Sequence, residues 1–122
     1  MIEYLKRIKA LNENLKTIII GGASCPFRLF EALKDRDLKV YNVFGMTEVS
    51  GCIGINDTMD GTYKIFASSK VAIEADGEIV VSGDCVMKGY DKDEAYTKRV
   101  IRDGVYHTGD IGRINDKAVL YF

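Results

Sequence analysis

The sequence predicts an α/β unit followed by a small β lobe: a βαβ piece of a parallel sheet, then an antiparallel, β-barrel-like lobe. Two observations carry this prediction. Two apolar runs with a helical segment between them occupy residues 15–44. Beyond residue 50, short β-rich runs alternate with turns that contain Asn, Asp and Gly. We therefore expect a partial α/β subdomain over residues 1–50 and a β-rich subdomain over residues 51–122.

The composition is that of a globular protein with no preference for polyanions. Of the 122 residues, 47% are hydrophobic and 29% are charged, which is too apolar for a disordered chain. The net charge of −1 offers nothing to attract nucleic acid or an anionic membrane. No apolar run approaches the length of a bilayer span, and the first residues lack the apolar core of a signal peptide. We expect a cytoplasmic protein without nucleic-acid or membrane partners.

The number and spacing of the three cysteines also fit a reducing, cytoplasmic compartment. Cys25, Cys52 and Cys85 are odd in number, far apart and without Cys-x-x-Cys spacing. The single histidine, His107, has no potential ligand beside it, which argues against a zinc site. We expect all three thiols to be free and reduced, packed as small apolar side chains.

The α/β unit is expected to begin with a helix, because residues 2–15 place apolar side chains at spacings of three and four. Thr-Ile-Ile-Ile at residues 17–20 then predicts a strand that is covered on both faces. Ser24 is a suitable N-cap and Pro26 suits the first turn of the following helix. A second strand over residues 38–44 completes the unit, with parallel strands and a right-handed crossover.

The β lobe is predicted from short runs that are separated by turn signals. Strands are expected near residues 63–66, 71–73, 79–81, 105–107 and 118–121. Asp-Gly pairs mark turns between several of them, which is typical of antiparallel pairing. One short helix, from Lys92 to about Val100, interrupts the series.

Two parallel strands alone cannot bury both faces of a sheet. Ile18, Ile20, Val40 and Val43 are therefore expected to be exposed. We expect the chain either to form a dimer or an oligomer with exchanged elements that covers this surface, or to belong to a larger sheet.

Glycine-containing loops follow both parallel strands. Such sheets bind ligands beyond the carboxyl ends of their strands, so Gly21-Gly22-Ala23 and Gly45-Met46-Thr47-Glu48 are expected side by side. Glycines let the backbone approach a flat ring, on which Tyr41 or Phe44 can stack. The Thr47 hydroxyl suits a phosphate, and the Glu48 carboxylate suits Mg²⁺. Taken alone, the second loop is better explained as a plain turn with a capping Thr and a solvated Glu.

A third segment, His107-Thr108-Gly109-Asp110, lies between two predicted strands. Gly109 lets the chain turn, and Asp110 can accept two hydrogen bonds from a ribose diol. Alone this is a turn aspartate. Together the three segments describe an ATP or AMP site.

Four motifs, in this order, resemble those of the adenylate-forming (AMP-binding) superfamily, which includes acyl-CoA synthetases, luciferases and peptide-synthetase adenylation domains. They are Gly21-Gly22-Ala23, then Phe44-Gly45-x-Thr47-Glu48, then residues 77–83 with Gly89-Tyr90, and last Tyr106-x-Thr108-Gly109-Asp110. The resemblance covers about residues 15–122.

The resemblance implies roles for individual residues. Those implied to bind the nucleotide are Gly21, Gly22, Ala23, Phe44 and Gly45 around adenine and Asp110 at the ribose. Thr47 and Glu48 are the implied catalytic residues, with Thr47 at the phosphates and Glu48 as a ligand of Mg²⁺. His107 stands at the variable position of its motif and receives no role.

The implied parent enzyme is an AMP-forming acyl-CoA synthetase, an acid–thiol ligase. It would activate a carboxylic acid with ATP and Mg²⁺ as an acyl-AMP and then transfer the acyl group to CoA. Met46 favours this reading over a peptide-synthetase adenylation domain, which usually has Pro there. The family's first phosphate loop and its C-terminal lobe with the catalytic lysine have no counterpart in this sequence. We therefore expect an internal segment of such an enzyme that is inactive alone.

Two other interpretations stay open. The chain is also consistent with a truncated relative that binds nucleotides or other proteins without chemistry. An unrelated α+β protein with chance motifs would have no affinity for adenine nucleotides. The residues near the predicted acyl pocket do not identify the acid.

Overall fold

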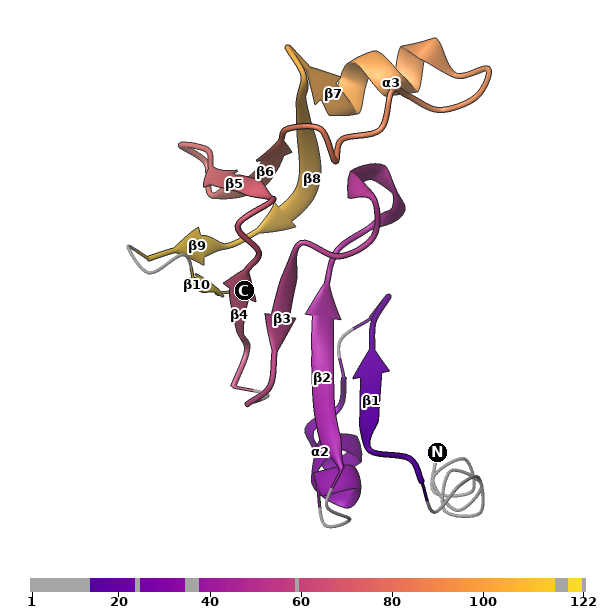
Figure 1. Cartoon of the computed structure of the whole chain (residues 1–122). Helices are drawn as coiled ribbons and strands as arrows, with labels where there is room; N and C mark the ends of the chain where they lie inside the picture. The colour runs from indigo at the N-terminus through magenta and orange to yellow at the C-terminus, as the bar shows by residue number, and fades with distance from the viewer. Residues whose placement is uncertain (1–13, 24, 35–37, 59, 116–118, 122) are drawn as a thin grey trace.

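In the residues that it describes, the computed structural model of the chain contains two β-sheets, two α-helices and one short 3₁₀ helix (Figure 1). It describes residues 14–23, 25–34, 38–58, 60–115 and 119–121. The helix predicted over residues 2–15 lies almost wholly outside these ranges. None of the helices in the described ranges has the length and apolar character needed to cross a membrane.

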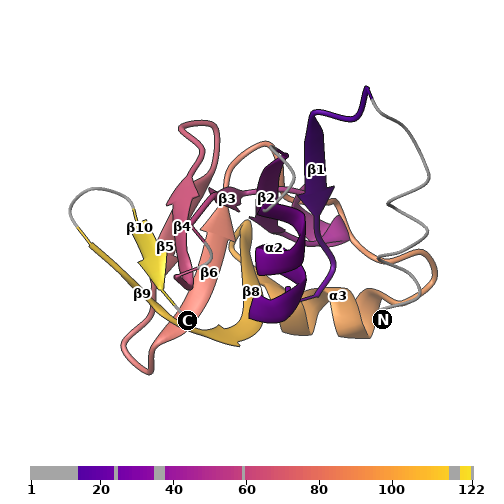
Figure 2. The same ribbon diagram turned by 90° about the horizontal axis from the view of Figure 1, so that it is seen from below.

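The predicted βαβ unit is confirmed. Strands β1 (Thr17–Ile20) and β2 (Lys39–Phe44) pair in parallel, and helix α2 (Phe27–Lys34) connects them. Pro26 lies just before the helix, and its carbonyl accepts the Leu29 N–H at 2.8 Å. Figure 2 shows α2 lying along one face of this strand pair.

The apolar surface of the strand pair differs from the prediction. Val40 is buried with Phe30 and Leu33 of α2, and Ile18 and Ile20 are half-buried against that cluster. The helix thus covers much of the surface that was expected to be exposed. The exposed apolar residue is Ile19 instead, with 66% of its surface accessible, because β1 is an edge strand whose other face is open in the described structure.

The first sheet continues beyond β2 with antiparallel strands, in the order β1-β2-β3-β4-β10-β9. These are β3 (Gly54–Asn56), β4 (Thr62–Ile65), β9 (Arg113–Ile114) and β10 (Val119–Tyr121). They all follow residue 50 in the chain, yet they extend the sheet that β1 and β2 begin. The division expected at residues 50 and 51 therefore does not coincide with the division between the two sheets.

The second sheet is antiparallel, with the order β5-β6-β8-β7. Its strands are β5 (Lys70–Ile73), β6 (Glu78–Ser82), β7 (Ile101–Arg102) and β8 (Val105–Ile111). Helix α3 (Glu94–Val100) leads into β7, and the Asp93 side chain caps it by accepting the Tyr96 N–H at 2.9 Å. The antiparallel lobe and this helix are as predicted, but the described strands form an open sheet and not a closed barrel.

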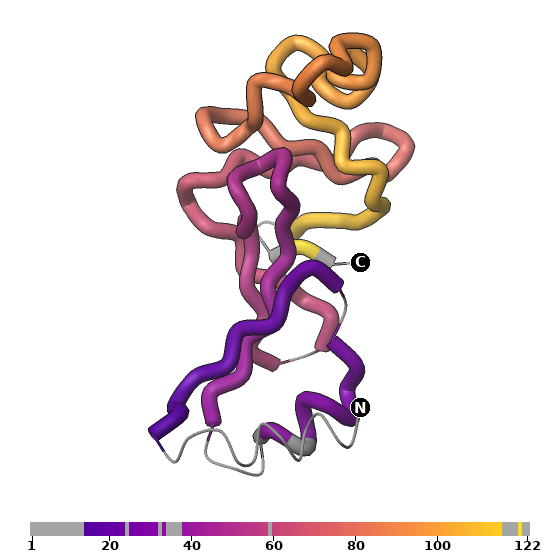
Figure 3. The backbone as a smooth tube through the Cα atoms, turned by 90° about the vertical axis from the view of Figure 1, so that its right-hand side faces the viewer, coloured from indigo at the N-terminus to yellow at the C-terminus, as the bar shows by residue number. Residues whose placement is uncertain are grey.

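The two sheets pack against each other through a shared core. Tyr63 of β4 and Leu120 of β10 bury their side chains with Ile79 of β6. The tube in Figure 3 shows the chain passing from one sheet to the other and back. The contact fixes where the loops after β1 and β2 lie relative to β8.

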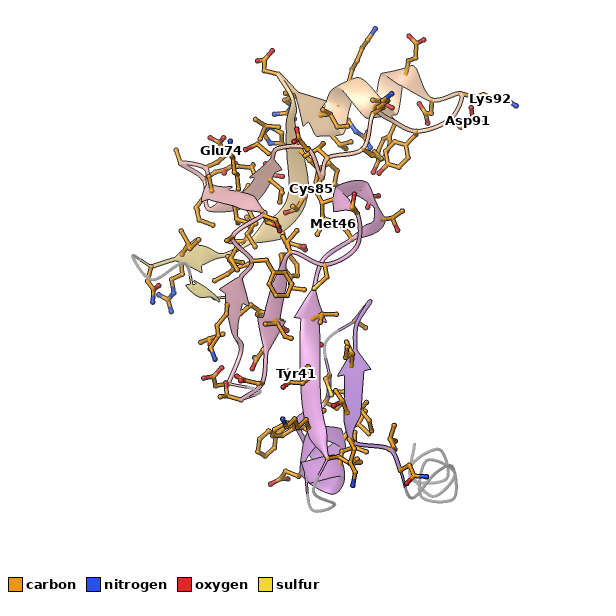
Figure 4. All side chains as sticks on the ribbon, viewed as in Figure 1. Tyr41, Met46, Glu74, Cys85, Asp91 and Lys92 are labelled. Atoms are coloured by element: carbon orange, nitrogen blue, oxygen red, sulfur yellow. The ribbon has the colours of Figure 1, made fainter. Side chains whose placement is uncertain are left out.

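A second cluster lies beneath the loop that follows β2. Val49 and Ile53 of this loop are buried with Val81 of β6 and Tyr106 of β8. Met46 packs against the same cluster, near the segment that carries Cys85 (Figure 4). The loop with the predicted Thr-Glu pair is therefore held by the core of the second sheet.

Burial predicts a clear contrast between two strand isoleucines. Ile79 is fully buried between the sheets, whereas Ile19 is 66% exposed. We expect Ile79→Ala to lower the free energy of unfolding by about 3 kcal/mol, through lost burial and the cavity left behind. The matched variant Ile19→Ala should lower it by less than about 0.5 kcal/mol. Urea unfolding measures both, and equal losses would contradict the packing described here.

Candidate functional site

A cavity of about 680 Å³ opens beyond the carboxyl ends of β1 and β2, between the two sheets. Its size is typical of a site for a small organic molecule. Its walls come from both glycine loops, from β4 and from β8. The lining residues are Gly22, Ala23, Val43, Phe44, Gly45, Met46, Glu48, Gly61, Tyr63, Tyr106, Thr108 and Asp110.

The cavity brings together most of the residues that the sequence singles out. Six of the predicted site residues line it: Gly22, Ala23, Phe44, Gly45, Glu48 and Asp110. Gly21 and Thr47 are not among the lining residues. A Cβ at Gly21 would come within 2.6 Å of Val43 Cγ2, so this glycine lets the end of β1 lie close to β2. Thr47 is exposed at the start of the 3₁₀ helix η1 (Thr47–Val49).

The loop after β2 turns back tightly on itself at Gly45. The Gly51 N–H donates to the Met46 carbonyl at 2.9 Å, and the Ile53 N–H donates to the Phe44 carbonyl at 2.9 Å. A Cβ at Gly45 would overlap the backbone of Gly51. Glycine is therefore required here by a close backbone approach, and the same turn leaves Gly45 on the cavity wall.

Beside the predicted Phe44, the cavity wall includes Tyr63, which the sequence did not single out. The rings of Phe44 and Tyr63 lie 6.0 Å apart at 60°. Asn42 Nδ2 donates to the Tyr63 hydroxyl at 2.8 Å, and burial raises the pKa of that hydroxyl. Asn42 Oδ1 is buried and has no partner among the described residues, which leaves one acceptor to be satisfied. Finding this pair requires the pairing of β2, β3 and β4, which the sequence does not reveal.

Glu48 is fixed by the segment that connects β6 to α3. Its Oε1 accepts the Tyr90 hydroxyl at 2.7 Å, and its backbone carbonyl accepts the Met87 N–H at 2.8 Å. The hydrogen bond to Glu48 raises the pKa of Tyr90 far above its ordinary value, and burial of the phenol is a second, smaller cause of this rise. Within the described ranges, Oε2 has no recorded hydrogen bond, and no group of three or more His, Cys, Asp or Glu side chains forms a metal cage.

One such carboxylate fits Mg²⁺ held mainly by a bound phosphate. Mg²⁺ commonly keeps several waters and takes one or two carboxylates together with substrate phosphates, and does not need an all-protein cage. Glu48 lies on the cavity wall with one oxygen open in the described structure. The donor set is therefore suitable for Mg²⁺ only when a phosphate shares it.

Asp110 projects from a bulge in β8. Val80 pairs with His107 and Glu78 pairs with Ile111, so a single residue of β6 faces the three residues 108–110. Gly109 has φ of 77°, which glycine adopts without strain. The bulge exposes the Asp110 carboxylate on the cavity wall. No partner for that carboxylate is recorded in the described part of the chain.

Glu78 holds the bulge from the neighbouring strand. Its Oε1 accepts the Gly109 N–H at 2.9 Å, and its Oε2 lies 2.8 Å from His107 Nδ1. The hydrogen bond with His107 lowers the pKa of Glu78. His107, which received no role from the sequence, is thus the partner of a glutamate in another predicted motif.

The lowered pKa of Glu78 predicts a contribution to stability that acid removes. Because this pKa is lower in the folded chain than in the unfolded one, the contribution is complete above its usual value of 4.5 and is lost as the pH falls through the lower folded value. On going from about pH 6 to pH 3, the wild type should lose about 1 kcal/mol more stability than Glu78→Gln. The exposed Glu74 (Figure 4) offers a control, because Glu74→Gln should keep the wild-type pH dependence. Parallel losses in wild type and Glu78→Gln during urea titrations would contradict this account.

Curated relatives of this sequence are CoA ligases. The chain is 33% identical to 2-succinylbenzoate–CoA ligase of Listeria innocua over 129 residues, which covers 99% of the chain and 28% of the ligase. It is also 33% identical to a long-chain-fatty-acid–CoA ligase of Mycobacterium bovis over 121 residues, covering 96% of the chain and 20% of that enzyme. The chain thus spans about a quarter of the length of these relatives.

The fold is shared with a solved CoA synthetase. Unliganded O-succinylbenzoate coenzyme A synthetase from Bacillus subtilis matches with a TM-score of 0.80 at 28% identity, over 98% of this chain and 28% of the synthetase. The same synthetase has been solved with ATP and a magnesium ion and with AMP.

The family itself follows from a match over most of the chain. The model of the AMP-binding enzyme family matches residues 2–91, a range that includes three of the four motifs quoted from the sequence. The fourth motif supplies Tyr106, Thr108 and Asp110 to the same cavity. With the match, the relatives and the fold in agreement, the chain belongs to the AMP-binding enzyme family.

Proposed function

We propose that this chain carries the nucleotide site of an AMP-forming acyl-CoA synthetase. The observation that carries the proposal is the single cavity onto which Gly22, Ala23, Phe44, Glu48 and Asp110 all open. Relatives named as CoA ligases support the reaction class. The parent enzyme would join a carboxylic acid to AMP, release pyrophosphate, and then transfer the acyl group to CoA.

Each part of ATP has a suitable group in the cavity. The backbone at Gly22 and Ala23 would lie along adenine, with the Phe44 ring beside it. Asp110 would accept both ribose hydroxyls.

The phosphates would lie near the loop after β2. Glu48 would hold Mg²⁺ there, and Thr47 would offer its hydroxyl to a phosphate oxygen. Mg²⁺ bound to the phosphates neutralises charge that develops on the departing pyrophosphate.

We further propose that this chain alone does not catalyse adenylation at a useful rate. No Lys or Arg is among the residues that line the cavity in the described structure. The charge on pyrophosphate would then be met by Mg²⁺ at Glu48 alone.

A second candidate follows from the same observation: a nucleotide-binding or interaction module without chemistry. A third, part of a peptide-synthetase adenylation domain, is disfavoured by Met46. Nucleotide binding without release of pyrophosphate would favour the second candidate.

We also propose that the chain self-associates through an exposed sheet edge. The open edge of β1, with exposed Ile19, suits a dimer or an exchanged oligomer that adds a strand there. A monomer by light scattering at high protein concentration would refute this assembly.

Cys25, Cys52 and Cys85 are free thiols, which supports a cytoplasmic location.

Calorimetry of AMP binding tests the ribose contact. We expect Asp110→Ala to weaken AMP binding at least about tenfold, because two hydrogen bonds to a charged group are lost. Asp91 is exposed, away from the cavity (Figure 4), and Asp91→Ala should bind AMP like the wild type. A wild-type chain that binds neither AMP nor ATP would overturn the proposed function.

The metal contact is tested by the same titrations with ATP, with and without Mg²⁺. Mg²⁺ should strengthen ATP binding to the wild type, because Glu48 and the phosphates share the ion. In Glu48→Ala this enhancement should disappear, while AMP binding without Mg²⁺ stays within about twofold of wild type. An undiminished enhancement in Glu48→Ala would exclude Glu48 as a ligand.

A further inference from the structure

The bulge that carries Asp110 needs an acceptor from outside its own strand. Residues 108–110 face a single residue of β6, so they lie outside the regular ladder of hydrogen bonds. A backbone N–H left without a partner costs free energy, and so a stable bulge requires other acceptors. Here the Gly109 N–H is accepted by Glu78 of β6, and the Asp110 N–H by the Thr108 hydroxyl of the bulge itself.

Two groups of β6 hold the bulge. The Thr108 hydroxyl donates to the Ile79 carbonyl at 2.7 Å and accepts the Asp110 N–H at 3.1 Å. Glu78 accepts the Gly109 N–H at 2.9 Å with the oxygen that does not contact His107. The Glu78 and His107 side chains are 20% and 15% exposed, so the pair is shielded from competing water.

The Asp110 side chain has no comparable support. It is exposed, and in the described structure its carboxylate accepts no hydrogen bond. Its direction toward the cavity is therefore set by the backbone of the bulge. The contact that fixes that backbone at Gly109 is the one made by Glu78.

We propose that Glu78 is a positioning residue for nucleotide binding: it holds the bulge at residues 108–110 so that Asp110 faces the ribose. This inference rests on the proposed function, because it takes the ligand of Asp110 to be a ribose diol. His107 restrains the second oxygen of Glu78 and so fixes the plane of the carboxylate. Glu78 itself touches no nucleotide atom in this arrangement, since it is not among the residues that line the cavity.

Calorimetry on the full chain with two nucleotides isolates this role. AMP carries the diol, and 2′,3′-dideoxy-AMP lacks it. We expect Glu78→Ala to weaken AMP binding about tenfold and dideoxy-AMP binding less than about twofold. The double variant Glu78→Ala/Asp110→Ala should bind AMP no more weakly than Asp110→Ala alone, because both changes remove one contact.

A conservative variant and a distant control complete the design. Glutamine keeps an acceptor for the Gly109 N–H and an amide that can hydrogen-bond to the His107 ring, so Glu78→Gln should bind AMP within about threefold of wild type. Glu74 lies in the turn between β5 and β6, and Glu74→Ala should bind both nucleotides normally. Amide hydrogen exchange without nucleotide provides an independent measurement, in which Gly109 should exchange faster in Glu78→Ala than in wild type.

The outcomes separate the two proposals. A wild type that binds no AMP overturns the proposed function and this inference with it. If the wild type binds AMP, an unchanged affinity in Glu78→Ala overturns the inference alone. Equal weakening for AMP and dideoxy-AMP would also overturn it, because Glu78 would then support the fold generally. Unchanged exchange at Gly109 would show that Glu78 does not hold the bulge.

Discussion

The burial of Ile79 between the two sheets is the contact on which the rest of the structure depends. Its side chain is enclosed with Tyr63 and Leu120 of the first sheet. Its backbone carbonyl accepts a hydrogen bond from the Thr108 hydroxyl, and the carboxylate of the neighbouring Glu78 accepts one from the Gly109 N–H. The same part of β6 therefore also holds the bulge in β8. A residue that joins the sheets therefore also sets the distance between the glycine loops of one sheet and the aspartate of the other.

The cavity has an unusual charge balance for a site that would take a polyanion. Glu48 and Asp110 bring two carboxylates to its wall, and no Lys or Arg lines it in the described structure. Two negative groups oppose a triphosphate unless a cation lies between them. The two carboxylates are also held differently, since Glu48 is tied to Tyr90 whereas Asp110 is oriented only through its backbone. The arrangement suits Asp110 to a neutral diol and Glu48 to a cation.

Much of the fold follows from local sequence patterns. The β-branched run at residues 17–20 and the apolar run that ends at Phe44, with Pro26 between them, were enough to predict the βαβ unit. The Asp-Gly turns marked most of the antiparallel strands. Strands β3, β7 and β9 escaped prediction because each has only two or three residues and lacks the apolar run that marked the equally short β10.

The site was predictable only where glycine or a motif marked it. Five of the six predicted residues on the cavity wall meet there because they lie at or after the ends of two parallel strands, a rule of topology that sequence order supplies. The sixth, Asp110, comes from β8 of the other sheet, and only its motif marked it. The Asn42–Tyr63 contact and the Glu78–His107 pair depend on strand register over separations of 21 and 29 residues. Nothing in the local pattern encodes those registers. The exposure expected at Val40 was wrong for a related reason, since it required knowing how α2 lies on the strands.

The hydrogen bond between Tyr90 and Glu48 bears on which cation the proposed metal site would accept. With Oε1 engaged by the phenol at 2.7 Å, the carboxylate presents one oxygen to the cavity. Ca²⁺ commonly takes both oxygens of a carboxylate in its wide, flexible coordination shell, whereas Mg²⁺ takes one oxygen from each ligand in a strict octahedron. If Glu48 holds the proposed Mg²⁺, the Tyr90 hydroxyl would therefore limit the carboxylate to one metal-binding oxygen and would favour Mg²⁺ over Ca²⁺.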